Sequence, residues 1–311
     1  MTTSAIRPTS TAGARPSGAA APRSREIVVA ASGLELSALL TEPAGEPRAT
    51  VVAVHGGGMR AGYFDGQAHP GVSLLRLGAS LGYTMIALDR PGYGRSADRL
   101  PSGQALADQA ATLRAALVTL RTRHPTGAGV LLLGHSYGGK LALATAAQAG
   151  AELLGVDVSG LGHRYAVDAH SALAGPRAHR LHWGPLRLYP PGTFSRAAPL
   201  VTPMPDDERR EAPRWPELFP EIASRVRVPV RFTFAEHEGW WCHDEASVAD
   251  LTQMLAAPSV RAERMAHSGH NISLGWTARA YHLRALAFLE ECLVRDDLST
   301  PASYEERTPT R

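Results

Sequence analysis

A serine lies between glycines at a point where the sequence pattern changes from strand to helix. Ser136 stands in the run G-H-S-Y-G, residues 134–138, which fits the pattern G-x-S-x-G. The apolar run 130–133 before it predicts a buried strand, and the run 140–149 after it, rich in Ala and Leu, predicts a helix. A tight turn between the two lifts the serine clear of the backbone, and the glycines let strand and helix pack beneath it. The spacing therefore predicts an exposed, nucleophilic serine at the carboxyl edge of a sheet.

Ser136 needs partners, because a serine hydroxyl is a poor nucleophile at neutral pH unless a base takes its proton and an acid orients that base. We expect both partners at the ends of later strands. The predicted strand 228–235 is followed by two glutamates, Glu236 and Glu238. The last predicted strand is followed by two histidines within residues 267–270. The order along the chain is therefore serine, acid, histidine.

Four motifs together resemble those of the α/β-hydrolase superfamily, and the resemblance covers roughly residues 26–295. The first motif is the G-H-S-Y-G turn. The others are V-H-G-G at residues 54–57, D-R-P-G-Y-G-R-S at residues 89–96 and S-G-H at residues 268–270. The resemblance implies an α/β-hydrolase fold, with a mostly parallel eight-stranded sheet, helices on both faces and an inserted lid.

The resemblance also assigns a role to each member of a catalytic triad. Ser136 is expected to be the nucleophile, His270 the general base and later the acid, and Glu238 the carboxylate that orients the base. His270 matches the histidine that follows a glycine after the last strand, and His267 is the alternative. Position rather than residue type selects His270, because the chain has 13 histidines.

The acid position departs from the family pattern. The family usually has G-x-x-D after this strand, whereas residues 235–238 here read A-E-H-E. Glu238 falls at the acid position, and its extra methylene must be accommodated. Glu236 and Asp244 stay open as alternatives, although each of them could instead be a solvated loop carboxylate.

Two backbone N–H groups are expected to hold the oxyanion that forms when the serine attacks a carbonyl. By resemblance they belong to Tyr137, directly after the nucleophile, and to Gly57. Gly57 lies in the glycine triplet 56–58 after a buried strand, where bare backbone can approach a ligand; a flexible loop is the alternative interpretation. Loss of one such donor typically costs about 100- to 1,000-fold in rate.

Aromatic residues near the triad are the candidates for a substrate pocket. Trp240 and Trp241 directly follow the predicted acid, and His135 precedes the serine. The tryptophans would suit an apolar or aromatic acyl group, although either could instead pack beneath the lid. Arginines in the predicted lid would attract an anionic substrate or an acidic carrier domain, or else form a solvated face. They are Arg164, Arg177, Arg180, Arg187 and Arg196.

The elements that must position these residues follow from the alternation of apolar patterns. Eight strands are predicted, at residues 27–31, 34–41, 50–54, 84–88, 130–133, 153–158, 228–235 and 260–265. Helices are predicted at residues 72–81, 104–124, 140–149, 244–256 and 277–294. Ser32-Gly33 between the first two strands predicts an antiparallel hairpin, whereas the later strands, separated by helices, imply a mostly parallel sheet.

The chain divides into one core, one insertion and two tails. Residues 1–25 contain no acidic residue and are rich in Ala, Pro, Ser, Thr, Gly and Arg, which predicts a disordered tail. Residues 26–160 and 226–295 are predicted to form the core. The alternation of strands and helices stops in residues 161–225, the predicted lid, and residues 296–311 are predicted to be a polar tail.

Composition narrows the function classes. The formal net charge of the 311 residues is +3, and the basic residues form no dense run, so no nucleic-acid partner is expected. No apolar run approaches the roughly 18 residues that span a membrane. Two cysteines cannot form a disulfide framework, which favours a reducing, cytoplasmic location. Neither a metal nor a cofactor is expected, because no metal-ligand spacing and no dinucleotide-binding loop is found.

We therefore predict a serine hydrolase, similar to carboxylesterases and thioesterases, that cleaves a small-molecule ester or thioester through an acyl-enzyme on Ser136. An acyltransferase or cyclase on the same fold, in which another nucleophile replaces water, is the first alternative. A non-catalytic binding protein on a hydrolase scaffold is the alternative of another class. The identity of the substrate and the oligomeric state stay open, with a homodimer as one option.

Overall fold

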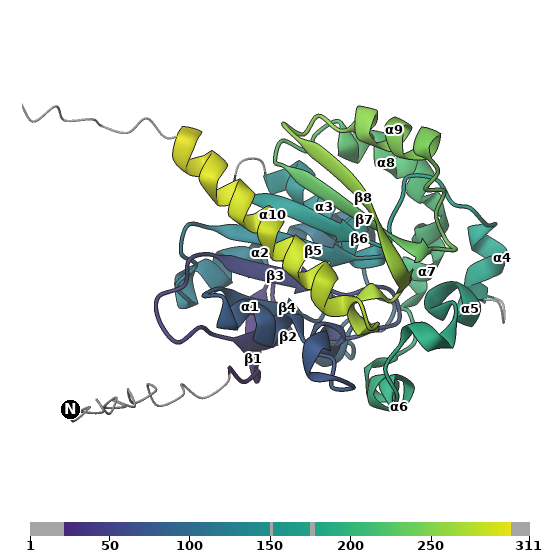
Figure 1. Ribbon diagram of the computed structural model, residues 1–311. Helices are drawn as coiled ribbons and strands as arrows, with labels where there is room; N and C mark the ends of the chain where they lie inside the picture. Colours follow the sequence, from purple (N-terminus) through teal and green to yellow (C-terminus); the bar gives the residue numbers. More distant parts are fainter. Residues whose placement is uncertain (1–21, 150–151, 175–177, 300–311) are drawn as a thin grey trace, which may run out of the picture.

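An eight-stranded sheet runs through the part of the chain that the computed structural model describes, residues 22–149, 152–174 and 178–299 (Figure 1). The strands are β1 (Arg25–Ala31), β2 (Leu34–Thr41), β3 (Thr50–Val54), β4 (Thr84–Leu88), β5 (Val130–His135), β6 (Gly155–Ser159), β7 (Val230–His237) and β8 (Val260–Gly269). They lie in the order β1-β2-β4-β3-β5-β6-β7-β8. β2 is antiparallel to both β1 and β4, and all other neighbours are parallel. The predicted mostly parallel sheet is confirmed.

The central strands are buried on both faces of the sheet. Every residue of β3, β4, β5 and β6 is buried, which explains why these segments are almost continuously apolar in the sequence. Successive side chains of a strand point to opposite faces. Accordingly, Val52 and Val54 of β3 belong to one hydrophobic core, and Val51 and Ala53 belong to the other.

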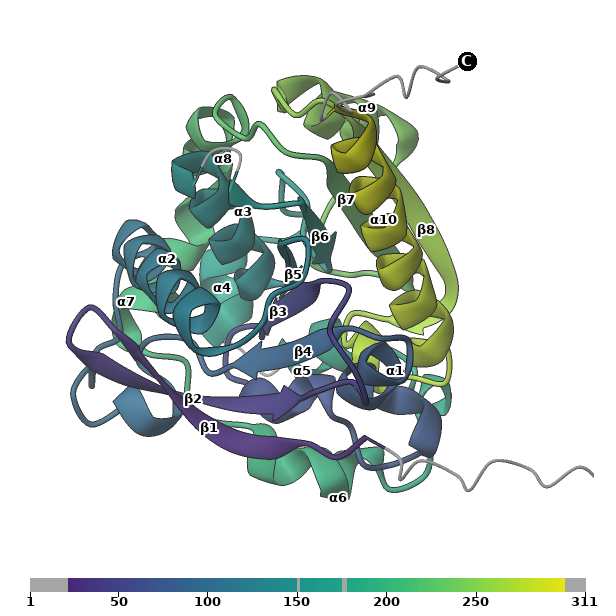
Figure 2. The ribbon, with the colours of Figure 1, turned by 90° about the vertical axis from the view of Figure 1, so that its left-hand side faces the viewer.

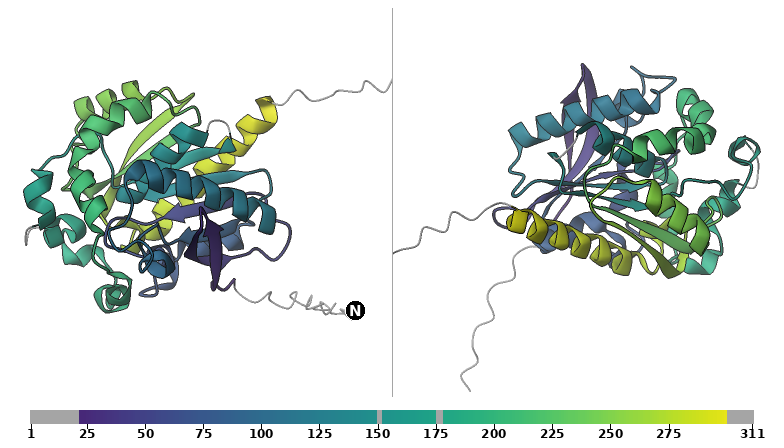
Figure 3. Two further views of the ribbon diagram at one scale, coloured as in Figure 1. Left: turned by 180° about the vertical axis from the view of Figure 1, so that it is seen from behind. Right: turned by 90° about the horizontal axis from the view of Figure 1, so that it is seen from above.

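Helices form one layer on each face, as Figure 2 and Figure 3 show. On one face lie α1 (Leu74–Ser80) and α10 (Ala278–Ser299). On the other lie α2 (Leu106–Arg123), α3 (Tyr137–Ala149) and α9 (Glu245–Met254). All five predicted helices are confirmed. α10 runs into the predicted polar tail, because the sequence has no helix-breaking residue before Pro301.

The hairpin turn between β1 and β2 is also confirmed. Ser32 and Gly33 have φ values of 50° and 76°, as a type I′ turn requires at its two central positions. β1 begins at Arg25, so the chain becomes regular one residue earlier than the tail prediction placed it. Residues 1–21 and 300–311 of the two predicted tails lie outside the described residues.

The segment between β6 and β7 is helical rather than irregular. It contains α4 (Ala169–Ala174), α5 (Ala178–Trp183), α6 (Thr193–Ala197), α7 (Asp206–Glu211) and α8 (Trp215–Ala223). None of these helices was predicted from the sequence, because most of them are too short to show apolar periodicity. The longest, α8, does show it, since the buried Trp215, Phe219 and Ala223 are spaced four residues apart.

Two further observations concern the helices and the cysteines. Among the described helices, none combines the length and the apolar character needed to cross a bilayer. Cys242 and Cys292 both carry free thiols.

Candidate active site

Ser136 sits at a sharp turn between β5 and α3, as the sequence predicts. Its φ of 54° is a left-handed conformation that non-glycine residues rarely adopt; such strain costs on the order of 1–3 kcal/mol. Its N–H donates to the Ser159 carbonyl on β6 at 2.8 Å. A Cβ on Gly134 would collide with the backbone of Gly138, and one on Gly138 would collide with the Val54 carbonyl. Both flanking glycines are therefore needed for α3 to pack closely behind the serine.

The predicted base and acid form a buried hydrogen-bonded pair. His270 follows β8 and Glu238 follows the neighbouring parallel strand β7, so strand pairing brings the two side chains together. Nδ1 of His270 lies 2.8 Å from Oε2 and 3.0 Å from Oε1 of Glu238, and both side chains are buried. Oε1 also accepts from the backbone N–H of Trp240 at 3.0 Å, which holds the longer glutamate side chain in place. A carboxylate at Nδ1 makes that nitrogen the donor and leaves Nε2 as the acceptor, the tautomer that a general base needs.

Ser136 and His270 line the same cavity, of about 180 Å³, which we name the smaller cavity. The Ser136 hydroxyl makes no hydrogen bond with His270 or with any other residue in the described ranges. Catalytic hydrogen bonds are often long until a substrate is bound, so this geometry is compatible with a nucleophile and its base.

A second cavity, of about 440 Å³, opens from the same serine, and we name it the larger cavity. The two cavities share Ser136, Gly57, Gly58 and His182. His270 lines only the smaller one. The serine therefore stands where two spaces meet, and the histidine faces one of them.

The three residues predicted for the substrate pocket all line these cavities. Trp240 and Trp241 line the larger cavity, and His135 lines the smaller one. The His135 ring stacks on Tyr63 with centroids 4.7 Å apart. Burial holds the pKa of His135 well below its usual range, so this ring is a neutral wall of the smaller cavity.

The alternative base and acid residues lie elsewhere. The His267 side chain is 85% exposed, and its backbone N–H donates to Oε2 of Glu236 at 2.6 Å. Asp244 caps the N-terminus of α9 by accepting from the Ser247 N–H at 3.0 Å. None of the three candidates lines a cavity with Ser136. The geometry therefore favours the buried histidine–glutamate pair.

The predicted oxyanion donors lie beside the serine. Tyr137 is the first residue of α3, so the helix offers no acceptor for its N–H. Gly57, in the loop after β3, lines both cavities together with Ser136. No acceptor for either N–H is found among the described residues, so both are available to a ligand. The positive end of α3 also favours negative charge at this position.

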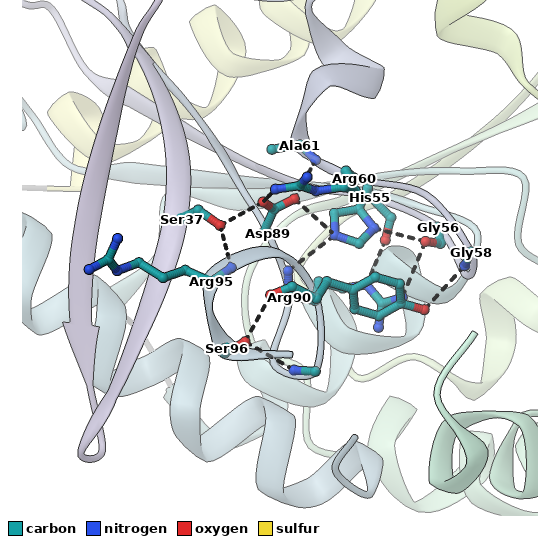
Figure 4. Close-up of polar contacts among 12 residues, drawn as sticks. Ser37, His55, Gly56, Gly58, Arg60, Ala61, Asp89, Arg90, Arg95 and Ser96 are labelled. Atoms are coloured by element: carbon teal, nitrogen blue, oxygen red, sulfur yellow. Dashed lines mark hydrogen bonds and ion pairs between the residues drawn. The ribbon is translucent and has the colours of Figure 1, made fainter. Parts of the chain in front are cut away.

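A buried network, drawn in Figure 4, holds the glycine loop. Arg90, in the segment after β4, donates from Nη2 to the Gly56 carbonyl at 3.2 Å. The Gly58 N–H donates to the Tyr93 hydroxyl at 3.1 Å. The loop is thus fixed on both sides of Gly57, which leaves the Gly57 N–H for the site.

Asp89 anchors the end of the same loop (Figure 4). It accepts from the Ala61 N–H at 2.7 Å and from Nη2 of Arg60 at 3.0 Å. Next to it, Nε2 of His55 accepts from the Arg90 N–H at 3.1 Å. Burial, and then the charge of Arg90, lower the pKa of His55 to about 3, so the ring is neutral and can accept. The D-R-P-G-Y-G-R-S segment therefore serves to position the loop.

Arg90 also ties the segment 161–225 to this loop, a contact that sequence reasoning missed. Glu208 on α7 pairs with both Nη atoms of Arg90, at 2.7 and 2.8 Å, and both side chains are fully buried. The Tyr93 hydroxyl donates to Glu208 at 2.8 Å. No local pattern signals such a pair, because its members lie far apart in the chain.

The arginines expected to attract an anionic substrate do not line either cavity. This holds for the four that the structure describes, Arg164, Arg180, Arg187 and Arg196. Arg177 lies outside the described residues. The cations that do line the larger cavity are Lys140 and Arg209.

The sheet order and the strand–serine–helix turn define the α/β-hydrolase fold. The model of the family described as "Alpha/beta hydrolase family" matches residues 51–282. The chain therefore belongs to the alpha/beta hydrolase family, and the family predicted from the sequence is confirmed.

Solved structures of esterases share this fold. A thermostable carboxyl esterase from Bacillus coagulans superposes with a TM-score of 0.65 at 17% identity, over 88% of this chain and 100% of that one. Carboxylesterase CesB from Bacillus subtilis gives 0.58 at 18% identity, over 86% and 92%. The thioesterase domain from the curacin biosynthetic pathway gives 0.58 at 15% identity, over 87% and 99%. Identities this low show the fold alone, and no curated protein sequence matches the chain.

Proposed function

We propose that the protein is a serine hydrolase that cleaves an ester or thioester through an acyl-enzyme on Ser136. The observation that carries the proposal is the strained turn at Ser136, which lines one cavity together with His270, whose Nδ1 is hydrogen-bonded to Glu238. Backbone strain of this kind clusters at functional sites. Membership of a hydrolase family, and the esterase and thioesterase names of similar structures, support the same reaction class.

In the proposed reaction, Oγ of Ser136 attacks the substrate carbonyl while Nε2 of His270 takes the serine proton. The N–H groups of Gly57 and Tyr137 bind the oxyanion, and Glu238 stabilises the imidazolium. When the bond to the leaving group breaks, the imidazolium returns the proton to the leaving oxygen or sulfur. Water then attacks the acyl-enzyme and gives a proton to Nε2 of His270. The imidazolium returns this proton to Oγ of Ser136 as the acyl–oxygen bond breaks, which releases the acid and the free serine.

The two cavities would take different parts of the substrate. The base must return a proton to the leaving group, so the alcohol or thiol lies on the His270 side, in the smaller cavity. The acyl group then extends from Ser136 into the larger cavity, along Tyr137 and the two tryptophans. The volumes of about 180 and 440 Å³ suit a small leaving group and a larger acyl group.

We also assign the role of a lid to residues 161–225. Met204 and Arg209 from this segment line the larger cavity, Val201 and Thr202 line the smaller one, and His182 lines both. A cover of this kind keeps bulk water from the reacting bond and strengthens the electrostatic interactions inside the site.

Intact mass after exposure to a fluorophosphonate tests the activated serine. The wild type should gain one adduct, and Ser136→Ala should gain none. Ser195→Ala, which removes an exposed serine on α6, is the matched control and should react like the wild type. An unlabelled wild type, or a labelled Ser136→Ala variant, would contradict the proposal.

Product analysis separates hydrolysis from acyl transfer. With aryl esters and acyl thioesters in the presence of amine or alcohol acceptors, the free acid should be the main product. A majority of transferred acyl product would favour the acyltransferase or cyclase alternative instead.

A further inference from the structure

One buried cation in the larger cavity has no part in the reaction described above. Lys140 lies on α3, four residues after Ser136, and is the only lysine in the sequence; all other members of the 32 Lys and Arg residues are arginines. Lys140 is 3% exposed. Its Nζ donates to the Tyr165 hydroxyl at 2.8 Å and to the Ala212 carbonyl at 2.9 Å. A lysine is rarely buried so completely unless its charge is paired or used.

Aromatic rings surround this ammonium at 5.3 to 5.6 Å from Nζ to the ring centroids. They belong to Tyr137, Tyr165, Trp215 and Trp241. Ring faces attract a cation, yet burial still lowers the pKa of Lys140 to about 7. An ammonium has three N–H groups, and the described part of the chain provides acceptors for two of them. The protein alone therefore leaves this cation incompletely satisfied.

Two residues that line the larger cavity each carry a donor that lacks an acceptor among the described residues. The donors are the buried indole N–H groups of Trp240 and Trp241. Arg209 adds a second cation to the lining, and none of the described lining residues is a carboxylate. The cavity thus combines positive charge with unused donors, which suits a ligand that brings negatively charged oxygen atoms.

We propose that the acyl group of the substrate ends in a carboxylate that accepts a hydrogen bond from Nζ of Lys140. The substrate is then a half-ester of a dicarboxylic acid, with its ester carbonyl at Ser136 and its free carboxylate at Lys140. This inference rests on the proposed function, because it takes Ser136 as the nucleophile. Four residues along α3 correspond to about 6 Å along the helix axis, which an acyl chain of several methylene groups spans.

A carboxylate fits these donors better than a neutral carbonyl does. It brings a full negative charge, which offsets the burial of the ammonium and favours the protonated lysine. It also has two oxygens, so that it can accept from the third N–H of Lys140 and from a second donor of the cavity at once.

Two esters of equal chain length test the inference. Monomethyl adipate carries the carboxylate and methyl hexanoate does not, and methanol release gives kcat/KM for each. The wild type should prefer the half-ester. Lys140→Met keeps most of the side-chain volume but removes the charge, so it should lower the ratio of half-ester to neutral-ester kcat/KM by about 10- to 100-fold, the effect of losing a charge-assisted hydrogen bond.

Two further variants complete this test. Lys140→Arg keeps the positive charge and should retain most of the preference. Arg123→Gln removes an exposed positive charge at the end of α2, outside both cavities, and should leave both rates unchanged. The Tyr165 hydroxyl donates to the Ala212 carbonyl at 2.7 Å, so Lys140→Met leaves neither group without a partner. An unchanged ratio in Lys140→Met would overturn the inference.

Failure of the inference can be told apart from failure of the proposed function. A wild type that cleaves methyl hexanoate and takes the fluorophosphonate on Ser136, but shows no preference for the half-ester, would overturn the acidic acyl group alone. A wild type that cleaves neither ester and forms no adduct would overturn both.

The ratio of half-ester to neutral-ester kcat/KM should also depend on pH. If Lys140 had only a structural role, this ratio would not change with pH. Burial has the largest effect on the pKa of Lys140; Glu208 and Glu211 oppose it, and Arg90 adds to it. The other titratable groups that face Lys140 or line the cavity with it are Tyr137, Tyr165, His182 and Arg209. Burial raises the pKa of both tyrosines and lowers that of His182 to about 3, so these three do not titrate near pH 7.

Lys140 is therefore the group of the larger cavity that changes charge near neutral pH. It is protonated below a pH of about 7 and neutral above it, so the wild-type preference for the half-ester should fall as the pH rises through 7. With Lys140→Arg the preference should stay level, because a guanidinium keeps its charge. Dividing the two rates cancels any effect of pH that is common to both esters. A wild-type ratio that does not change between about pH 6 and 9 would overturn the inference.

Discussion

The two cavities that meet at Ser136 are built in different ways. The proposed catalytic residues of the smaller one directly follow strands, with the glycine loop 56–58 after β3 and His270 after β8, and the inserted segment adds His182, Trp183, Val201 and Thr202 to its lining. The larger one depends on side chains that helices and the inserted segment provide, among them Lys140 on α3 and Arg209 on α7. Strand pairing fixes the first set through the backbone, whereas the second set depends on side-chain packing.

This difference separates the reaction from the choice of substrate. Strand ends vary little in position once the sheet has formed, so they are suited to hold groups whose geometry must not change. Helix surfaces and insertions tolerate exchange of side chains, so they are suited to select the acyl group. Changes at the smaller cavity should therefore act on all substrates alike, and changes at the larger cavity should act selectively.

The largest effect is expected for His270→Ala. Loss of the general base should lower kcat by about 10⁴-fold or more, and equally for neutral and acidic esters, because both share the same chemistry. Steady-state kinetics on the two methyl esters measures this. His267→Ala, at an exposed position, is the control and should keep full activity. A larger loss of kcat in His267→Ala than in His270→Ala would contradict the prediction and make His267 the base.

Glu208→Gln should have the next largest effect, on stability. It leaves the buried Arg90 without its charge partner, which should lower the free energy of unfolding by about 3–5 kcal/mol. Urea unfolding followed by circular dichroism measures this value. Glu217→Gln, an exposed ion-pair residue of the same segment, should change it by less than about 1 kcal/mol. If both variants lowered the free energy of unfolding equally, the Arg90–Glu208 pair would not be what ties residues 161–225 to the core.

Glu238→Asp should have an intermediate effect. Removing one methylene draws the carboxylate away from Nδ1 of His270, now 2.8 Å distant, and a displacement near 1 Å costs about 100-fold in kcat/KM. Both esters should lose activity to the same degree. Glu236→Asp is the matched control and should leave kcat/KM for both esters unchanged. Full activity of Glu238→Asp would show that the acid position adapts to either residue.

Arg209→Gln should have the smallest effect. The Arg209 side chain is 49% exposed, and exposed charges contribute little, so KM for the half-ester should rise only about 2- to 5-fold. KM for the neutral ester should not change. Arg210→Gln, which is more exposed and lines neither cavity, is the control. A loss greater than that of Lys140→Met would make Arg209 the main anion ligand instead.

Sequence reasoning succeeded where the signal is local. Strand and helix patterns and the turn at Ser136 depend on neighbours in the chain, and the structure confirms them. The structure also brings His270 and Glu238 together, and the catalytic roles of Ser136, His270 and Glu238 stay predictions. The Arg90–Glu208 pair was missed because it joins the core to an insertion with no pattern in common. The cytoplasmic location and the homodimer stay predictions.

Lys140 was missed for a related physical reason. In the sequence it is an ordinary polar residue at the start of a predicted helix. Its burial is decided by Tyr165, Trp215 and Trp241, which come from three later segments and meet around it only in the folded protein. Tertiary packing of this kind leaves no periodic signal in the sequence.

The single lysine also changes how the protein responds to labelling chemistry. Acylating reagents usually modify many surface amines. Here the only side-chain amine is that of Lys140, which is buried and lines the larger cavity. The rate of its modification therefore reports how readily the acylating reagent reaches Lys140 in the larger cavity, without any turnover. Slower modification in the presence of a bound dicarboxylic acid would map the occupant directly.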